Sequence, residues 1–160
     1  RNLNLERAGF TAGPCLLKDT MQLSSFYKKK FNIGHEAMKI NEGIPDFIIK
    51  ELKKIKNIKT KTIGILGLTF KAETDDIRDS LSIKLKNKLK KLKYKILLSD
   101  EYYKDKENRD KNLLIKQSDI IIIGAPHEKY KTLKFPKNKK IIDIWGIYKK
   151  KYSINASKNL

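Results

Sequence analysis

The 160-residue sequence predicts an α/β fold in which a doubly wound parallel sheet follows a helical segment. Short runs of uninterrupted aliphatic residues indicate strands that are covered on both faces. Segments with apolar residues at helical spacing separate these runs, and the resulting strand–helix–strand order is typical of parallel strands joined by right-handed crossovers. A polar hinge at residues 57–61 separates the helical part from the sheet.

The first part of the chain contains two predicted helices. Glycine and proline interrupt residues 1–14, which indicates a loop, and Pro14 suits the first turn of a helix. This helix extends to the lysine cluster at residues 28–30. A second helix is expected over residues 35–55, with a kink or a split at Pro45 because proline removes one helical hydrogen bond.

The second part contains four predicted strands and two predicted helices. The strands occupy residues 62–68, 95–100, 119–125 and 140–145. One helix follows the leucines from Leu81 to Leu92, with Asp79 or Ser80 as its N-cap, and a short one covers residues 112–117. The polar tail is expected to be loose. The predicted units are residues 1–58, 59–150 and 151–160.

Composition limits the classes of function. Lysine and arginine number 37 against 18 acidic residues, and this net charge of +19 favours anionic ligands. Only four of these cations are arginine and the lysines are spread along the chain, whereas base readout favours arginine. We therefore expect solvated lysine faces and no nucleic-acid partner. No apolar run is long enough for a membrane helix and the mean hydropathy is −0.57, so we expect a cytoplasmic protein without membrane contact.

A few single residues are candidates for chemistry. The lone cysteine, Cys15, cannot form an internal disulfide and is either an inert core thiol or a reactive group. With only His35 and His127 and no second cysteine, no metal site is expected. His127 is interpreted as a loop residue. Asp100 ends a strand, where an acid can bind a ribose, but an ordinary strand-end carboxylate is favoured.

The first informative segment is Gly9-Phe-Thr-Ala-Gly-Pro-Cys15-Leu-Leu-Lys18-Asp19. It places a thiol in the first turn of a helix, where unpaired N–H groups and the helix dipole stabilise a thiolate. Lys18 and Asp19 follow at spacings that share the face of the cysteine. The segment fits an activated nucleophile. It fits an ordinary helix start with a Lys–Asp pair equally well.

The second informative segment covers residues 65–80. A strand ends at Gly67, a loop carries Lys71 and Arg78, and a helix opens near Asp79. Ligands of doubly wound sheets bind at the carboxyl ends of the strands, so two cations there indicate a phosphate site. The glycine pattern alone is a weak signal, because the full dinucleotide fingerprint is missing.

Together the two segments resemble the UDP-glucose/GDP-mannose dehydrogenase family. Its members show Cys-x-x-Lys-Asp, then a helix pair, then a strand followed by Phe-Lys-x-x-Thr-x-Asp-x-Arg-x-Ser. This chain has Cys15-Leu-Leu-Lys18-Asp19 and Phe70-Lys71-Ala-Glu-Thr74-Asp-Asp76-Ile-Arg78-Asp-Ser80. The resemblance covers residues 8–148. It implies the end of a central helical region that forms a homodimer, followed by a Rossmann-like domain that holds the nucleotide sugar.

The resemblance also implies a reaction, in which the C6 alcohol of a UDP-sugar is oxidised to a carboxylate with two NAD for polysaccharide biosynthesis. Cys15 would attack the C6 aldehyde to give a thiohemiacetal and then a thioester, and Asp19 would orient the hydrolytic water. Lys18 and Arg78 would reach the NAD cofactor. The residues implied to contact the nucleotide sugar are Phe10, Thr11, Ala12, Gly13, Phe70 and Lys71.

The sequence departs from the family in three ways. The loop before Cys15 has fewer glycines, and Trp145 stands where relatives often carry an arginine that holds the nucleotide sugar. A tryptophan can stack on a base or sugar but cannot pair with a phosphate. The amino-terminal NAD domain is absent and the chain starts without methionine, so we expect a piece with little activity alone. A non-catalytic basic Rossmann-like binding module and an inactive truncated relative remain alternatives.

Overall fold

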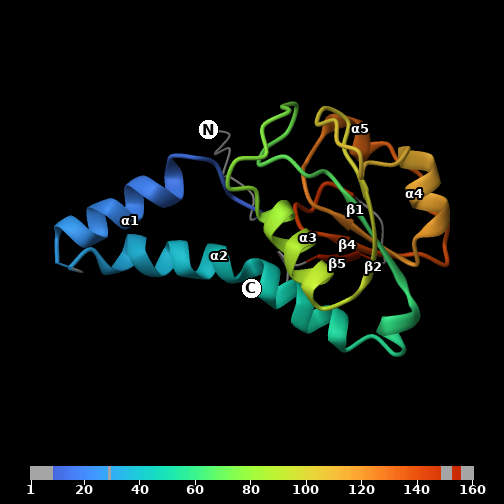
Figure 1. Ribbon diagram of the computed structural model, residues 1–160, viewed down its shortest axis with the longest axis horizontal. Coiled ribbons are helices and arrows are strands. Elements are labelled where there is room, and N and C mark those ends of the chain that lie inside the picture. The colour runs from blue at the N-terminus through green and yellow to red at the C-terminus, as the bar shows by residue number, and fades with distance from the viewer. Residues whose placement is uncertain (1–8, 29, 149–152, 156–160) are drawn as a thin grey trace, which may run out of the picture.

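The computed structural model describes residues 9–28, 30–148 and 153–155. A helical hairpin precedes a sheet that has helices on both faces (Figure 1). The hairpin consists of α1 (Leu16–Phe26) and α2 (Asn32–Lys53), and the 3₁₀ turn η1 (Ile58–Thr60) leads into the sheet. The predicted α/β, Rossmann-like fold is confirmed.

The sheet is parallel throughout and has the strand order β2-β1-β3-β4-β5. Its strands are β1 (Thr62–Leu66), β2 (Lys95–Ser99), β3 (Ile120–Ile123), β4 (Lys140–Asp143) and β5 (Ser153–Asn155). The helices of this part are α3 (Leu81–Lys91), α4 (Lys111–Gln117) and α5 (Glu128–Lys131). Strand β1 pairs with both β2 and β3, so successive strands are added first on one side of β1 and then on the other. The sheet therefore has a switch point between β1 and β3. Ligands of such folds bind at this switch point.

The central strand β3 explains why the apolar runs do not alternate with polar residues. Ile120 and Ile122 belong to the core cluster that α2 and α3 cover, whereas Ile121 and Ile123 belong to the cluster under α4 and α5. All four side chains are buried. Each face of the sheet therefore has its own core, so every position of the strand carries a buried apolar side chain.

Side-chain caps fix where α3 and α4 begin. Ser80 is the N-cap of α3: its Oγ accepts from the Ile83 N–H and donates to the Leu68 carbonyl, at 3.4 and 2.6 Å. The sequence left this position open between Asp79 and Ser80. Asp110 caps α4 in the same way by accepting from two backbone N–H groups.

Helix α2 runs through Pro45 as one helix, so the expected split does not occur. Pro45 is buried, and the residues that follow it on the same face, Ile48, Ile49 and Leu52, are buried in the core. The stripe of apolar burial continues past the proline and outweighs the one hydrogen bond that proline removes.

The expected loose tail at residues 151–160 needs a correction. Residues Ser153–Asn155 form β5, which pairs with β4 in parallel register. An edge strand offers unpaired N–H and C=O groups to any extended segment, whatever its side chains. This pairing does not depend on apolar side chains, which is why the polar sequence of the segment did not predict a strand. The other tail residues lie outside the described part of the chain.

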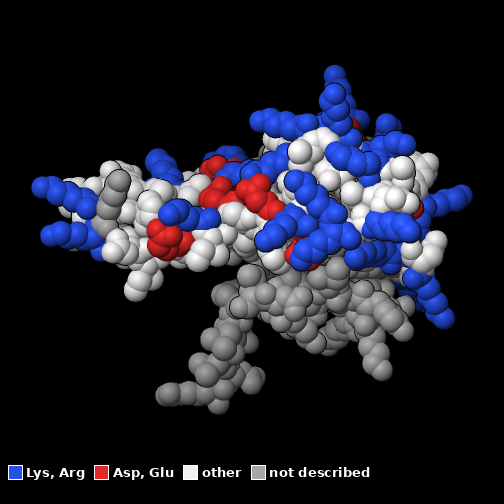
Figure 2. All heavy atoms as spheres, turned by 90° about the horizontal axis from the view of Figure 1, so that it is seen from below, with Lys and Arg blue, Asp and Glu red and all other residues white. Residues whose placement is uncertain are grey.

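The charged side chains are unevenly distributed on the face shown in Figure 2. Lysine and arginine cover much of the sheet domain and the far end of the hairpin, while acidic side chains gather mainly along the hairpin and near its junction with the sheet domain. Ion pairs cross this junction from Glu42 to Lys84 and from Asp46 to Lys88, both at 2.6 Å. Within the described residues, no helix is long and apolar enough to cross a membrane.

Candidate functional site

Cys15 is the N-cap of α1, one residue before the predicted position inside the first turn. Its side chain is exposed and makes no capping hydrogen bond. The residue still lies beside the unpaired N–H groups at the helix start, which favour a negative charge. The thiol is therefore accessible and available for chemistry.

The loop at residues 9–13, which leads to Cys15, lies against two residues of the sheet domain. A Cβ atom at Gly13, where φ is +131°, would lie 3.2 Å from Cε2 of Phe70. A Cβ atom at Gly9 would lie 2.2 Å from Cε3 of Trp145. Glycine is needed at both positions because backbone and aromatic ring approach so closely. The fold thus brings the first informative segment onto the second.

Arg78 extends from the second segment towards solvent, with 70% of its side chain exposed. Its Nε and Nη2 donate to Oδ2 of Asp76 at 3.0 and 2.6 Å. These hydrogen bonds and the charge of Asp76 raise the pKa of Arg78, and the nearby Cys15 adds a smaller contribution in the same direction. The same hydrogen bonds from Arg78 lower the pKa of Asp76. Cys15 therefore lies within electrostatic reach of Arg78.

The remaining predicted residues differ in how available they are to a ligand. Lys18 and Asp19 are exposed in the first turn of α1. Phe70 is half-buried, and the exposed Lys71 places its Nζ 5.5 Å from the centre of the Phe70 ring. Together, Phe70 and Lys71 present an aromatic face and a cation beside the loop that precedes Cys15.

Two residues of that loop are already used by the fold. The side chain of Phe10 is 2% exposed and belongs to the core, so only its backbone could meet a ligand. The Thr11 N–H donates to the Gly9 carbonyl at 2.9 Å, which removes it from the predicted backbone contacts to a diphosphate. Asn41 on α2 donates to the Thr11 carbonyl at 2.6 Å. Ala12 is partly buried and Gly13 is buried.

Trp145 is engaged by the fold as well. Its Nε1 donates to the Gly124 carbonyl at 3.0 Å, and its ring lies against Gly9. The Gly124 carbonyl also accepts from Ser82 Oγ at 2.9 Å. The indole therefore joins the end of β3 to the loop before Cys15, a structural role that the sequence did not predict.

Asp100 and His127 form a buried polar cluster that the sequence reading missed. Oδ2 of Asp100 accepts from the backbone N–H groups of Leu68 and Thr69, and its Oδ1 accepts from those of Tyr102 and Tyr103. Burial opposes ionisation of Asp100, yet hydrogen bonds from His127 and from these backbone groups outweigh it and hold the pKa of Asp100 below its usual value. His127, expected in a loop, has no exposed surface.

This cluster bears on whether the sheet domain could hold NAD. In a dinucleotide-binding fold, a free acid after the second strand of the unit binds the adenosine ribose. Asp100 occupies that place, but both of its oxygens are taken by backbone N–H groups. The turn after β1 also lacks the glycine fingerprint. The residues of the sheet domain do not fit the adenosine half of NAD.

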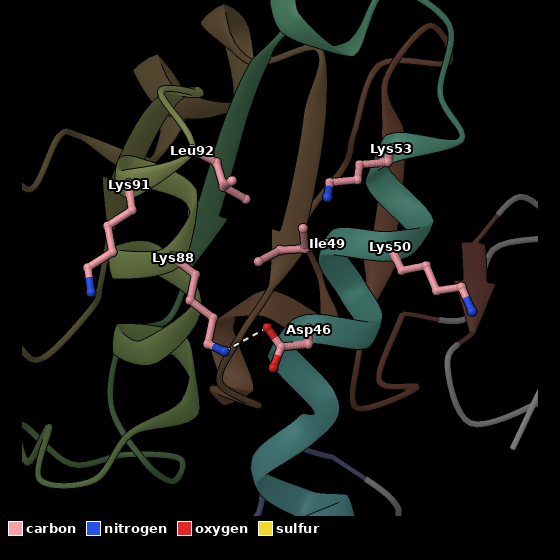
Figure 3. Close-up of a pocket in the computed structure, with 7 residues that line it drawn as sticks. All are labelled: Asp46, Ile49, Lys50, Lys53, Lys88, Lys91 and Leu92. Atoms are coloured by element: carbon pink, nitrogen blue, oxygen red, sulfur yellow. Dashed lines mark hydrogen bonds and ion pairs between the residues drawn. The ribbon is translucent and has the colours of Figure 1, made fainter.

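A separate hollow lies between α2 and α3 (Figure 3). It is lined by Asp46, Ile49, Lys50, Lys53, Lys88, Lys91 and Leu92. Lys88 pairs with Asp46 at 2.6 Å across the hollow, while Lys50 and Lys91 extend away from it. None of its lining residues belongs to the two segments that the sequence singled out. Within the described residues, no group of three or more His, Cys, Asp or Glu side chains could hold a metal ion.

A parallel sheet with a switch point at β1 and β3, together with a cysteine loop packed on the β1 loop, defines a Rossmann-like α/β protein with an accessible thiol. Residues 64–150, more than half of the chain, match the model described as "UDP-glucose/GDP-mannose dehydrogenase family, UDP binding domain". The chain belongs to this family.

Individual relatives agree with this assignment. A UDP-N-acetyl-D-mannosamine dehydrogenase of Pyrococcus horikoshii is 30% identical over 86% of this chain and 35% of its own length. A GDP-mannose 6-dehydrogenase of Pseudomonas aeruginosa is 27% identical over 88% of this chain and 37% of its own length. The chain thus spans little more than a third of the length of these relatives.

Solved structures show the same fold. A UDP-D-ManNAc dehydrogenase from Pyrococcus horikoshii matches 93% of this chain and 39% of its own chain, with a TM-score of 0.77 and 27% identity. A UDP-glucose dehydrogenase from Pyrobaculum islandicum matches 92% of this chain and 37% of its own, with a TM-score of 0.79 and 21% identity. Both matches include the helical hairpin as well as the sheet domain, because each covers more than nine tenths of the chain.

Proposed function

We propose that this chain is the part of an NAD-dependent nucleotide-sugar 6-dehydrogenase that binds the nucleotide sugar and carries the nucleophile. The observation that supports this most strongly is the contact between Gly13 and Phe70, because it packs the loop before Cys15 against the loop that carries Lys71. Membership of the family supports the nucleotide ligand, and the names of the relatives support the reaction class.

In this proposal the loop after β1 holds the nucleotide. Phe70 offers a half-buried ring for stacking, and Lys71 offers an exposed cation for the diphosphate. Ala12 and Gly13 border this surface from the other side, which leaves the sugar next to Cys15. The nucleotide is a UDP-sugar in this proposal, and Trp145 supports the loop before Cys15 through its contacts with Gly124 and Gly9.

The covalent chemistry belongs to Cys15. Its thiolate adds to the C6 aldehyde, and the former carbonyl oxygen, now an alkoxide, takes a proton, which gives a thiohemiacetal. Loss of a hydride and a proton converts this to a thioester. Water oriented by Asp19 then cleaves the C–S bond, which releases the carboxylate and returns the thiol. The covalent bond keeps the reactive aldehyde in the site.

NAD would be held by a part of the enzyme outside this chain and would accept the two hydrides of the overall oxidation. Lys18 and Arg78 fit a supporting role towards it, because both are exposed and Arg78 lies within electrostatic reach of Cys15. The hairpin would form the homodimer contact. Most of the large exposed apolar side chains of the described residues lie on it, among them Phe26, Ile33 and Ile40.

Nucleotide binding is testable on this chain by calorimetric titration with UDP. Lys71→Gln should weaken UDP binding at least about tenfold, because a charged hydrogen bond contributes roughly 1.5–3 kcal/mol. Lys50→Gln is the matched control, since it removes an exposed lysine of the separate hollow between α2 and α3. Equal losses in the two variants would mean that UDP responds only to the general positive charge, as expected of a basic binding module.

The role of the thiol is testable in a complete enzyme that contains this chain. Cys15→Ser should abolish formation of the uronic acid and leave UDP affinity within about twofold of the parent enzyme, because the sulfur acts on C6 and not on the nucleotide. The measurement is product analysis after incubation with UDP-sugar and NAD. Unimpaired formation of the acid would exclude Cys15 as the nucleophile.

A further inference from the structure

The loop at residues 67–80 depends on a buried histidine that comes from another strand end. The Glu73 N–H donates to Nδ1 of His127 at 3.0 Å, across 54 positions of sequence. His127 follows β3, has no exposed surface, and lies at the N-cap of the short helix α5. The contact therefore ties the loop that presents Phe70 and Lys71 to the far side of the switch point between β1 and β3.

The hydrogen-bond partners of His127 define its tautomer. A backbone N–H can only donate, so Nδ1 must accept from Glu73 and cannot carry a hydrogen. In the neutral ring the hydrogen is then on Nε2, which lies 3.4 Å from both Oδ2 of Asp100 and Oγ1 of Thr69. Thr69 Oγ1 donates its own hydrogen to the Lys71 carbonyl at 2.8 Å, so its oxygen can only accept from the imidazole.

Glu73 itself is held at several points around this histidine. Its φ of 54° is in the left-handed region, which a non-glycine residue adopts only when its surroundings impose it. Its Oε1 accepts from the Glu128 N–H at 2.9 Å, and its Oε2 accepts from the Tyr102 hydroxyl. Segments that follow β2 and β3 thus converge on one residue of the loop that follows β1.

We propose that His127 is a positioning residue: with its hydrogen on Nε2, it accepts the Glu73 N–H and fixes the loop that places Phe70 and Lys71 beside Gly13. It does not touch a ligand, because it is fully buried beneath the loop. The proposal rests on the proposed function only in naming a nucleotide as the ligand of that loop. The hydrogen bonds and the tautomer stand independently of it.

The tautomer is measurable on the unliganded chain by long-range ¹H–¹⁵N correlation of the imidazole nitrogens. The chain has two histidines, and His35→Gln assigns the signals. At neutral pH, His127 should show a bare Nδ1 and a protonated Nε2. A hydrogen on Nδ1 would remove the acceptor for Glu73 and overturn the proposal, whether or not the chain binds UDP.

Substitution separates a positioning role from simple loss of packing. His127→Asn keeps an acceptor near the place of Nδ1, whereas His127→Leu keeps bulk without any acceptor. The Glu73 amide should remain protected from hydrogen exchange in the Asn variant and exchange at least tenfold faster in the Leu variant. UDP affinity should follow the same order, with about a tenfold loss for Leu and less than a threefold loss for Asn.

The outcomes distinguish the two proposals. If wild-type chain fails to bind UDP but the tautomer and the Glu73 protection are as stated, the proposed function fails and the positioning role of His127 holds. If Asn and Leu variants lose Glu73 protection equally, the acceptor is not what holds the loop and the positioning role is wrong. Should His127→Leu not fold, the tautomer of the wild-type chain and the protection of the Glu73 amide in the Asn variant still test the positioning role.

Discussion

The Asp100 carboxylate accepts hydrogen bonds from backbone N–H groups in the two segments that follow the neighbouring strands β1 and β2. Leu68 and Thr69 follow β1, while Tyr102 and Tyr103 follow β2. A neutral side chain of the same shape could accept fewer of these hydrogen bonds, and each would be weaker than one to a charged acceptor. Ionised Asp100 therefore stabilises the folded state specifically, through the geometry of both loops.

Protonation of Asp100 should make the folded state less stable in acid. Because the pKa of folded Asp100 is lowered from 3.8, its contribution is complete above about pH 5 and is lost as the pH falls below 3.8 towards the folded value. Asp100→Asn should reduce the free energy of unfolding at pH 7 by about 1–3 kcal/mol. It should also flatten the loss of stability in acid. Urea unfolding at steps from pH 7 to pH 3 measures both effects.

Asp46→Asn serves as the control for this experiment. Asp46 is exposed and pairs with Lys88 at the surface, so its removal should change stability by less than about 1 kcal/mol. An acid limb of Asp100→Asn as steep as that of the parent chain would contradict the prediction.

Residue types and spacing were enough to predict that Cys15 lies at a helix start and that Lys71 and Arg78 lie in the loop after a strand, because these positions depend on local sequence. They were not enough for His127. Its surroundings, Pro126 and Glu128, are typical of a surface loop, and its burial arises only when the ends of β1, β2 and β3 converge. The same limit applies to Trp145, whose partners Gly9 and Gly124 are remote in sequence.

Among the elements, β1 to β4 were predictable because each apolar run meets a core on both faces. Helix α3 was predictable because its leucines follow helical spacing after an N-cap candidate at Asp79 or Ser80. The predictions failed where tertiary contacts override local preference. Pro45 remains helical because the residues after it are buried, and β5 forms because β4 has an open edge. Neither cause is visible within a short window of sequence.

Substitution by alanine should have opposite effects on stability at two glycines, Gly67 and Gly43. Gly67 directly follows β1 with a φ of +90°, and a Cβ atom there would lie 2.5 Å from the backbone nitrogen of Ala125. Gly67→Ala should destabilise the chain by about 2–4 kcal/mol, because neither the backbone conformation nor the neighbouring backbone can yield cheaply. Gly43, inside α2, has open space around its Cα. Gly43→Ala should therefore stabilise by about 0.5–1 kcal/mol.

Thermal or urea unfolding of the two variants checks these signs. Opposite signs are the expected result, since both changes add the same methyl group. Destabilisation by Gly43→Ala of the same size as that by Gly67→Ala would show that the close packing at the switch point is not what demands glycine.

On the scale of the whole molecule, the hairpin is far less well covered than the sheet domain. Phe26 and Ile33 are 80% and 87% exposed, near the turn between α1 and α2. The sheet domain, in contrast, encloses two complete cores. Exposed apolar surface of this kind is typical of an interaction site, and a second copy of the hairpin is the partner in the proposed homodimer.

We expect this chain to self-associate through the hairpin. Ile33→Glu should weaken self-association at least tenfold, because burying one such side chain contributes roughly 1.5–3 kcal/mol. Leu113→Glu is the matched control: Leu113 is exposed on α4, in the sheet domain. Sedimentation equilibrium over a range of concentrations measures both. A monomeric parent chain, or equal effects of the two changes, would rule out this surface.

The loop before Cys15 is held from two sides. Asn41 of α2 binds the Thr11 carbonyl, and Phe70 of the sheet domain covers Gly13. In the proposed complex, the gap between the sulfur and the nucleotide would consequently be set by the angle at which the two parts of the chain meet. Any assembly that binds the hairpin would also control that angle. Quaternary contacts far from the sulfur would therefore be expected to tune its reactivity without touching the substrate.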